Sequence, residues 1–224
     1  MLATSEGHLR IPIKPDGPDM IFEQGRGHLK QINMIVPLFR KQVAFSRFIR
    51  TFEEVCLQPG DNVRLYIIVF LGESPDNESE LALQETMSIT EQLASRYGDK
   101  ERIKVNSVRG KFARARALQY GMAQVESQDL LFFIDVDMVW TAKTLQRVRL
   151  NTKIGESVYF PVVFSEFDPA ITYGQNVAPN HFLINDETGY WRVYGFGIMS
   201  AYKSDIERVR NKSEKPTFIS YVIL

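Results

Sequence analysis

The first 150 residues of the chain alternate between two patterns of hydrophobic positions. Short runs rich in apolar residues, typical of strands, are followed by stretches in which apolar residues recur every three or four positions, typical of helices packed on one side. Strands are expected at 32–36, 63–71, 103–108 and 130–134, and helices at 45–56, 79–97, 112–125 and 141–150. This alternation predicts an α/β fold with a mostly parallel, doubly wound central sheet.

Several positions within these elements carry expectations of their own. Pro37 is expected to end the first strand, because proline has no N–H to donate. The first helix should bury Phe45, Phe48, Ile49, Phe52 and Cys56 on one face, and the second should bury Leu83, Met87 and Leu93. After residue 155 the pattern loosens, with strands expected at 158–164 and 193–202.

Composition and charge exclude several classes of protein. The 224 residues are 44% hydrophobic, enough for one substantial core, and the equal numbers of basic and acidic residues, 27 each, give no overall field that would attract nucleic acid. Cys56 is the only cysteine, which excludes an internal disulfide and a cysteine-built zinc site, and it is expected to be inert packing. Residues 1–20 hold no apolar stretch long enough for a signal peptide or membrane span, so the sequence as written shows no route into the secretory pathway.

Two carboxylates follow directly after the most apolar run of the chain. If the strand that covers 130–134 continues, Asp135 and Asp137 point to the same side, about 6–7 Å apart, while Val136 points to the other. The carboxyl end of a strand is where open α/β sheets bind ligands. Such a pair suits a divalent cation that could hold the diphosphate of a nucleotide through oxygen ligands. The alternative is a turn or helix cap, for which aspartate is also common; the preceding buried strand favours a functional site.

Four cations surround the start of the helix expected at 112–125. Arg109, Lys111, Arg114 and Arg116 lie where the helix dipole disfavours positive charge, and a bound phosphate would resolve that conflict. A solvated basic turn is an equally good interpretation on local grounds, although the small alanines nearby favour a ligand slightly.

Two further segments are candidates for the same edge of the sheet. Arg40 follows the first strand, so it could converge with Arg114 and the two aspartates on one nucleotide; alternatively it is only the polar start of the next helix. The segment 191–197 combines aromatic residues with glycines, which suits stacking on sugar rings or, equally, a core hairpin.

Five ordered segments together resemble the chondroitin synthase and chondroitin N-acetylgalactosaminyltransferase family, most closely the carboxyl-terminal domain of the bifunctional synthases. They are Ile35–Leu38, Lys111–Ala115, Phe132–Asp137, Tyr159–Val162 and Gly189–Gly197. The resemblance covers about residues 30–209. It implies a GT-A glycosyltransferase fold that uses a UDP-sugar and Mn²⁺ in the Golgi lumen. The implied reaction is inverting transfer of GalNAc from UDP-GalNAc to the 4-hydroxyl of a terminal glucuronate on chondroitin.

The same resemblance assigns roles to individual residues. For the donor, Pro37 and Arg40 would line the uridine and phosphate site, and Phe112 and Arg114 would hold the nucleotide. Asp137 would bind the metal, with Asp135 in support and Val136 between them in the same motif. For the acceptor, the implied residues are Trp191, Gly195 and Gly197.

The sequence departs from the family pattern after residue 205. The family continues into a Gly-Trp-Gly-x-Glu-Asp segment that carries the catalytic base and then a metal-binding histidine, whereas this chain continues differently from residue 211 and stops at Leu224. His8, His28 and His181 do not match the missing ligand and are expected on the surface or in loops. No catalytic base is therefore assigned, and the expected organisation is an irregular segment 1–28, a glycosyltransferase domain 29–210 that is incomplete at its C-terminus, and a divergent tail 211–224.

Three functional interpretations follow. The first is a GalNAc-transferase domain impaired by truncation, without the membrane anchor that the family carries. The second is a non-catalytic partner that binds nucleotide-sugar and assists other chondroitin synthase subunits. The third is an unrelated nucleotide-binding α/β protein. The sequence leaves open whether GalNAc or glucuronate is donated, because both transfers occur in the same parent proteins.

Overall fold

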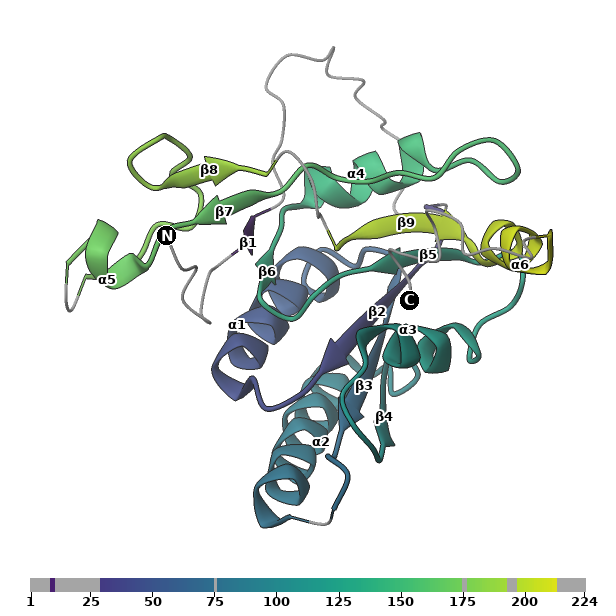
Figure 1. Ribbon diagram of the computed structural model, residues 1–224, viewed down its shortest axis with the longest axis horizontal. Coiled ribbons are helices and arrows are strands. Elements are labelled where there is room, and N and C mark those ends of the chain that lie inside the picture. The colour runs from purple at the N-terminus through teal and green to yellow at the C-terminus, as the bar shows by residue number, and fades with distance from the viewer. Residues whose placement is uncertain (1–8, 11–28, 75, 175–176, 193–196, 213–224) are drawn as a thin grey trace.

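The central feature of the molecule is a mostly parallel five-stranded sheet. The computed structural model describes residues 9–10, 29–74, 76–174, 177–192 and 197–212. Within them the central sheet has the order β4-β3-β2-β5-β9, with β9 antiparallel to β5 and the other pairs parallel (Figure 1). The strands are β2 (Ile32–Leu38), β3 (Val63–Phe70), β4 (Ile103–Val108), β5 (Leu130–Phe133) and β9 (Met199–Tyr202). The predicted α/β fold with a mostly parallel central sheet is confirmed.

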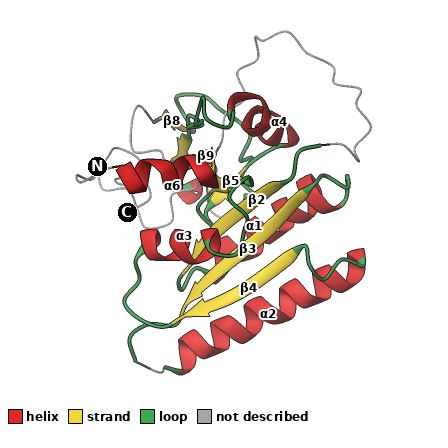
Figure 2. Cartoon of the chain, turned by 90° about the vertical axis from the view of Figure 1, so that its right-hand side faces the viewer, coloured by secondary structure: helices red, strands yellow, loops and turns green. Residues whose placement is uncertain are grey.

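Helices cover both faces of this sheet. On one face lie α1 (Gln42–Phe52), its continuation as the π-helix η2 (Glu53–Leu57), α2 (Asn77–Tyr97) and α4 (Ala142–Asn151); on the other lie α3 (Arg114–Met122) and α6 (Lys203–Lys212). Figure 2 shows the strands between α3 on one side and α1 and α2 on the other. The chain builds outward from β2 through β3 to β4 and then returns to β5 on the other side of β2. The strand order therefore reverses between β2 and β5, and ligands of open α/β sheets bind outside the carboxyl ends of strands at such a point.

The apolar face predicted for the first helix is the one that packs on the sheet. Phe45, Phe48, Phe52 and Cys56 are fully or almost fully buried, and burial raises the pKa of the Cys56 thiol. In α2 the expectation for Met87 was wrong, since its side chain is 41% exposed. The inner face of α2 carries threonines instead, whose hydroxyls bond to carbonyls of the preceding turn and so can be buried without an unpaired polar group.

Strand β2 passes through Pro37, where the strand was expected to end. Successive strand residues direct their N–H and C=O groups to alternate neighbours, and the Ile35 carbonyl accepts a bond from the Ile134 N–H on the β5 side (3.2 Å). Pro37 faces the same side two residues later, where β5 has already ended at Phe133. Its missing N–H therefore leaves no ladder position empty, and β2 continues along β3.

A second, smaller sheet lies to one side of the central sheet in Figure 1. Its order is β6 (Met138–Val139), β1 (Leu9–Arg10), β7 (Phe164–Glu166) and β8 (Gly189–Trp191), and the short helix α5 (Pro169–Thr172) follows β7. The strand expected at 158–164 was wrong in extent, because Tyr159 makes only an isolated bridge to Ser200 and β7 begins at Phe164. Of the strand expected at 193–202, β9 takes the last four residues, and 193–196 lie outside the described residues.

The expected segment 1–28 is described only at Leu9–Arg10, which pairs on both sides as β1 rather than being irregular there. The tail from residue 213 and the rest of 1–28 lie outside the described residues, so these domain boundaries stay predictions. Among the helices that the structure describes, none is both long enough and apolar enough to cross a membrane.

Candidate functional site

The two aspartates lie in a turn at the carboxyl end of β5. The strand ends at Phe133, the Ile134 N–H makes the last sheet bond, and the Met138 N–H then bonds to the Asp135 carbonyl at 3.2 Å. The extended conformation expected for this triplet was therefore wrong, because the chain must turn here to enter β6. The side chain of Val136 is buried in the core and does not line the site. The carboxylates of Asp135 and Asp137 both remain partly accessible to solvent.

Arg114 joins the start of α3 to this acidic turn. Its Nε donates to Asp135 Oδ1 at 2.8 Å, and its Nη2 donates to the Gly197 carbonyl. Arg114 and Asp135 therefore lie together at the carboxyl edge of the sheet, although the arginine belongs to a different β-α unit. Withdrawal from water raises the pKa of Asp135 above the ordinary aspartate value; Arg114 opposes this shift and the neighbouring Asp137 adds to it.

One carboxylate oxygen of Asp137 has no partner in the part of the chain that the structure describes. Its Oδ2 accepts a bond from Lys41 Nζ at 2.9 Å, whereas its Oδ1 is buried and has no hydrogen-bond partner among the described residues. An unpaired buried carboxylate oxygen is costly unless a donor or metal ion completes it. The residues therefore fit a divalent cation, with Asp137 as the group that would hold it. No cluster of three or more His, Cys, Asp or Glu side chains exists in the described ranges, so two carboxylates are what this part of the chain offers a metal.

Sequence reasoning missed Lys41 and selected its neighbour Arg40. Arg40 has a left-handed backbone conformation (φ 50°), and its guanidinium lies 3.4 Å from Asp76 and 3.8 Å from Glu78, at the start of α2. The expected convergence of Arg40 with the aspartates is therefore not present. The sequence shows two consecutive cations, Arg40 and Lys41, shortly after the first strand. Which of them points toward the aspartates depends on the backbone conformation at Arg40, which the sequence does not show.

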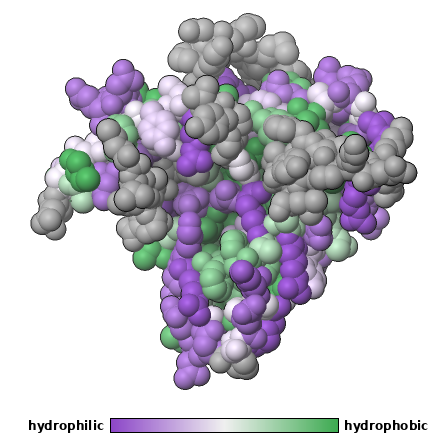
Figure 3. Space-filling view, in the orientation of Figure 1, coloured by the Kyte–Doolittle hydropathy of each residue, from purple (hydrophilic) through white to green (hydrophobic). Residues whose placement is uncertain are grey.

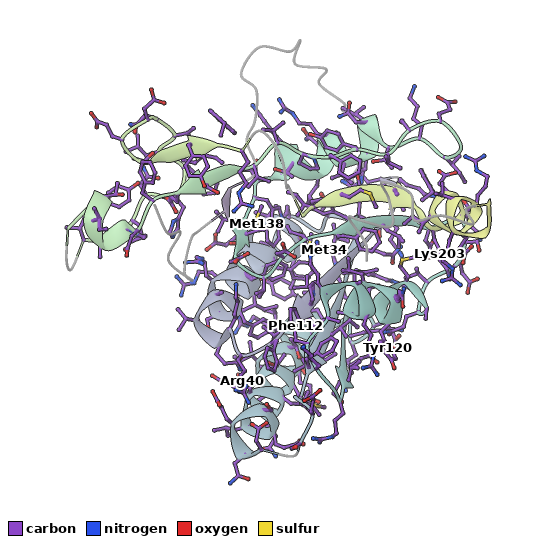
Figure 4. All side chains as sticks on the ribbon, in the orientation of Figure 1. Met34, Arg40, Phe112, Tyr120, Met138 and Lys203 are labelled. Atoms are coloured by element: carbon purple, nitrogen blue, oxygen red, sulfur yellow. The ribbon has the colours of Figure 1, made fainter. Side chains whose placement is uncertain are left out.

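An aromatic platform borders the site. The Phe112 ring, 40% exposed, stacks on Phe39 with centroids 5.5 Å apart and nearly parallel planes, and meets the Phe70 ring edge-on at 5.2 Å. Figure 3 shows an apolar patch ringed by polar residues where Figure 4 labels Phe112. A flat, partly exposed ring suits stacking on a nucleobase. Pro37, by contrast, is buried within β2.

The other cations of the basic helix start do not join the acidic turn. Arg109 pairs with Glu80 at 2.6 Å, and the Arg116 guanidinium lies over the Tyr120 ring at 5.8 Å. Lys111 is exposed. Of the four, Arg114 is the one that enters the site.

Of the three residues implied for the acceptor, the structure describes Trp191 and Gly197, which have different neighbours. Trp191, on β8, is 43% exposed and packs edge-on against Phe164, within the hairpin-like β7–β8 pair. Gly197 lies beside Asp135 instead, where an added Cβ would come 3.1 Å from Asp135 Oδ2. Gly195 lies outside the described residues.

A buried acid–imidazole pair was also missed. His181 lies in a loop, as expected, but its Nδ1 is 2.8 Å from Glu166 Oε2, and the Glu166 side chain is fully buried. The Glu166 position within a three-residue strand gave no sequence signal. His8 and His28 lie outside the described residues.

Gly197→Ala tests how closely this glycine supports the site. Gly197 has φ 64°, so alanine should lower the free energy of unfolding by about 1 kcal/mol, and its methyl group should displace the Asp135 carboxylate and weaken nucleotide binding. Gly155→Ala is the matched control, because Gly155 has a similar φ of 74° and open space at the Cβ position. Urea unfolding should show equal losses for the two variants, and calorimetry should show weaker UDP binding for Gly197→Ala alone. Equal UDP affinity in both would contradict this placement.

Comparison with known proteins gives a consistent result along the sequence. The sequence model of the family described as chondroitin N-acetylgalactosaminyltransferase matches residues 19–215. Human chondroitin sulfate synthase 3 is 36% identical over 185 residues, covering 82% of this chain and 20% of that protein. Mouse chondroitin sulfate N-acetylgalactosaminyltransferase 1 is 35% identical over 202 residues, covering 87% of this chain and 36% of that protein. The chain thus spans about a fifth to a third of the length of these relatives.

Solved structures match more weakly. A mannosyltransferase from Pyrobaculum calidifontis in complex with GDP-Man and Mn²⁺ is 13% identical, with a TM-score of 0.37 over 55% of this chain and 32% of that one. This overlap is too partial to support an assignment.

Proposed function

The chain belongs to the chondroitin N-acetylgalactosaminyltransferase family, and we propose that it binds a UDP-sugar at the edge formed by β2, β5 and α3 and serves in transfer of GalNAc to chondroitin. The observation that carries the proposal is the buried, unpartnered Oδ1 of Asp137 beside the Arg114–Asp135 pair. A cation would complete this oxygen at the switch point of the mostly parallel sheet, where a nucleotide diphosphate would be bound.

The donor site is assembled from three elements. The exposed face of the Phe112–Phe39 stack would carry the uracil ring, and Arg114 would hold Asp135 in place through its bond to Oδ1. Asp137 would hold the divalent cation, which we propose to be Mn²⁺; when bound, that ion supplies charge neutralisation for the departing UDP diphosphate. The ring stack and the turn that carries the two aspartates would together fix where the diphosphate lies, so that the sugar C1 would be presented in one orientation.

On the acceptor side, the proposal involves Trp191. The exposed ring of Trp191 is a surface on which a pyranose could stack, and the terminal glucuronate 4-hydroxyl would attack C1 with inversion. A general base must take the proton of that hydroxyl. We assign no such base among the described residues.

The cellular setting follows from the family alone. We propose action in the Golgi lumen, on a glucuronate-ended chondroitin oligosaccharide, in company with other chondroitin synthase subunits. The support for these three points is the sequence relationship, which extends over most of this chain but over a minor part of each relative.

A donor–acceptor matrix tests the proposed function. UDP-GalNAc, UDP-GlcA and UDP-GlcNAc are each offered with Mn²⁺ to chondroitin oligosaccharides that end in glucuronate or in GalNAc, and donor affinity is measured in parallel by calorimetry. We expect UDP-GalNAc to bind most tightly, and any incorporation to be of GalNAc onto glucuronate ends. Preferential binding of UDP-GlcA would reassign the donor, and absence of binding by all three UDP-sugars would contradict the proposal.

A further inference from the structure

Lys41, which follows strand β2, contacts the turn at residues 135–137 that carries the two aspartates. It occupies the N-cap position of α1, and its Nζ lies 2.9 Å from Asp137 Oδ2. Its side chain is 46% exposed, whereas that of Asp137 is 20% exposed. The ammonium therefore reaches from solvent into a more protected carboxylate.

The two carboxylates are neutralised in different ways. Asp135 is paired with Arg114, whose guanidinium is held at a second point by the Gly197 carbonyl. Asp137 is paired with the ammonium of Lys41, a single flexible contact on a four-carbon stem. The Arg114–Asp135 pair is held by two contacts, whereas the Lys41–Asp137 pair has one and its ammonium can leave more readily. Asp137 is also the carboxylate whose Oδ1 has no partner among the described residues.

We propose that Lys41 is an internal counter-ion that occupies Asp137 when no divalent cation is present, competes with that cation for the carboxylate, and moves to the donor diphosphate once it is displaced. The inference rests on the proposed function, because it assumes that Asp137 is the metal-holding residue. Lys41 would thereby make metal binding weak without the nucleotide and strong with it.

The surroundings of Lys41 provide the second position for its ammonium. The first turn of α1 contains no acidic residue, and no side chain caps its free N–H groups. The amino end of this 11-residue helix therefore favours an anion, and the Lys41 charge adds to that preference. A diphosphate at the edge between β2 and β5 would draw the ammonium away from Asp137 with little movement of the backbone.

The test compares Lys41→Met with wild type in two titrations. In the first, Mn²⁺ alone is titrated and the free ion is followed by electron paramagnetic resonance; loss of the competing ammonium should tighten Mn²⁺ binding by about fivefold, the upper range for a partly exposed ion pair. In the second, UDP is titrated by calorimetry at saturating Mn²⁺, and loss of the phosphate contact should weaken UDP binding by about tenfold. A merely structural role would move both affinities in the same direction.

Three further variants make the outcome decisive. Lys41→Arg keeps the charge, so its affinity for Mn²⁺ should stay near that of wild type. Lys100→Met removes a cation from the loop between α2 and β4, at the opposite edge of the sheet, and should change neither the Mn²⁺ affinity nor the UDP affinity. Asp137→Asn should abolish Mn²⁺ binding.

If Lys41→Met leaves Mn²⁺ affinity unchanged or lowers it, or if Lys100→Met has the same effect as Lys41→Met, the inference is overturned and the proposed function stands. If wild type binds no Mn²⁺ with or without UDP, the proposed function fails, and the inference with it.

Discussion

Asp137→Asn is expected to lower the affinity for UDP in the presence of Mn²⁺ by about a hundredfold or more, because it removes the charge from a carboxylate whose buried Oδ1 has no partner among the described residues. The substitution keeps the size of the side chain, so the turn between β5 and β6 should persist. Without Mn²⁺ the variant should bind UDP no more weakly than wild type, because the substitution removes a negative charge and releases Lys41 from its ion pair. Isothermal titration with and without the ion measures both affinities.

Asp186→Asn provides the control for loss of one acidic charge. Asp186 is exposed in the connection between β7 and β8, away from the turn that holds Asp137. It should bind UDP as wild type does. Undiminished Mn²⁺-dependent binding by Asp137→Asn would show that the metal, and with it the diphosphate, is held elsewhere.

Arg149→Met is expected to have the largest effect on stability, lowering the free energy of unfolding by about 3–5 kcal/mol. Arg149 Nη2 lies 2.5 Å from Asp61 Oδ1, and the two side chains are 9% and 13% exposed, so the substitution leaves a largely buried carboxylate uncompensated. Arg149 also donates to the Lys30 carbonyl at 2.7 Å, which ties α4 to the segment that enters β2. Urea unfolding followed by circular dichroism measures the loss.

Arg96→Met is the matched control, because Arg96 pairs with Glu53 at 2.6 Å but is 62% exposed. It should cost less than about 1 kcal/mol. Replacing Asp61 together with Arg149 by apolar residues should cost less than replacing Arg149 alone, since no buried charge is then left unpaired. Equal losses for Arg149→Met and Arg96→Met would refute the assigned role of burial.

The interior strands of the central sheet could be predicted from sequence because most of their residues are buried. Such strands read as short, largely apolar runs, and the strand expected at 63–71 differs from β3 (Val63–Phe70) by one residue. The strand order placed the ends of β2 and β5 side by side, so the neighbourhood of Asp135 and Arg114 could be anticipated from the alternation of strands and helices alone.

The smaller sheet could not be predicted in the same way. Its strands are two or three residues long, and β8 carries the exposed Tyr190 and Trp191, so no period-two pattern has room to develop. Its pairing also joins residues 9–10 to residues 138–139 and 164–165, a contact set by tertiary packing rather than by local sequence.

Only part of the site could be predicted, because its contacts also depend on tertiary structure. Which carboxylate lies next to which cation depends on side-chain direction at turns, and the sequence around residues 39–41 and 135–137 does not show the left-handed backbone of Arg40 or the turn at the aspartates. Lys41 rather than Arg40 therefore contacts Asp137, and the roles proposed for Arg114 and Asp135 rest on their position beside that contact.

Phosphorus relaxation of UDP-GalNAc in the presence of chain-bound Mn²⁺ tests most directly whether the acidic turn holds the donor diphosphate. Both phosphorus signals of the bound donor should broaden strongly with wild type, as expected for phosphates that contact the ion, and the broadening should disappear with Asp137→Asn. Broadening that persists unchanged in Asp137→Asn, or a donor that binds wild type with no effect of Mn²⁺ on its phosphorus signals, would contradict the proposed site.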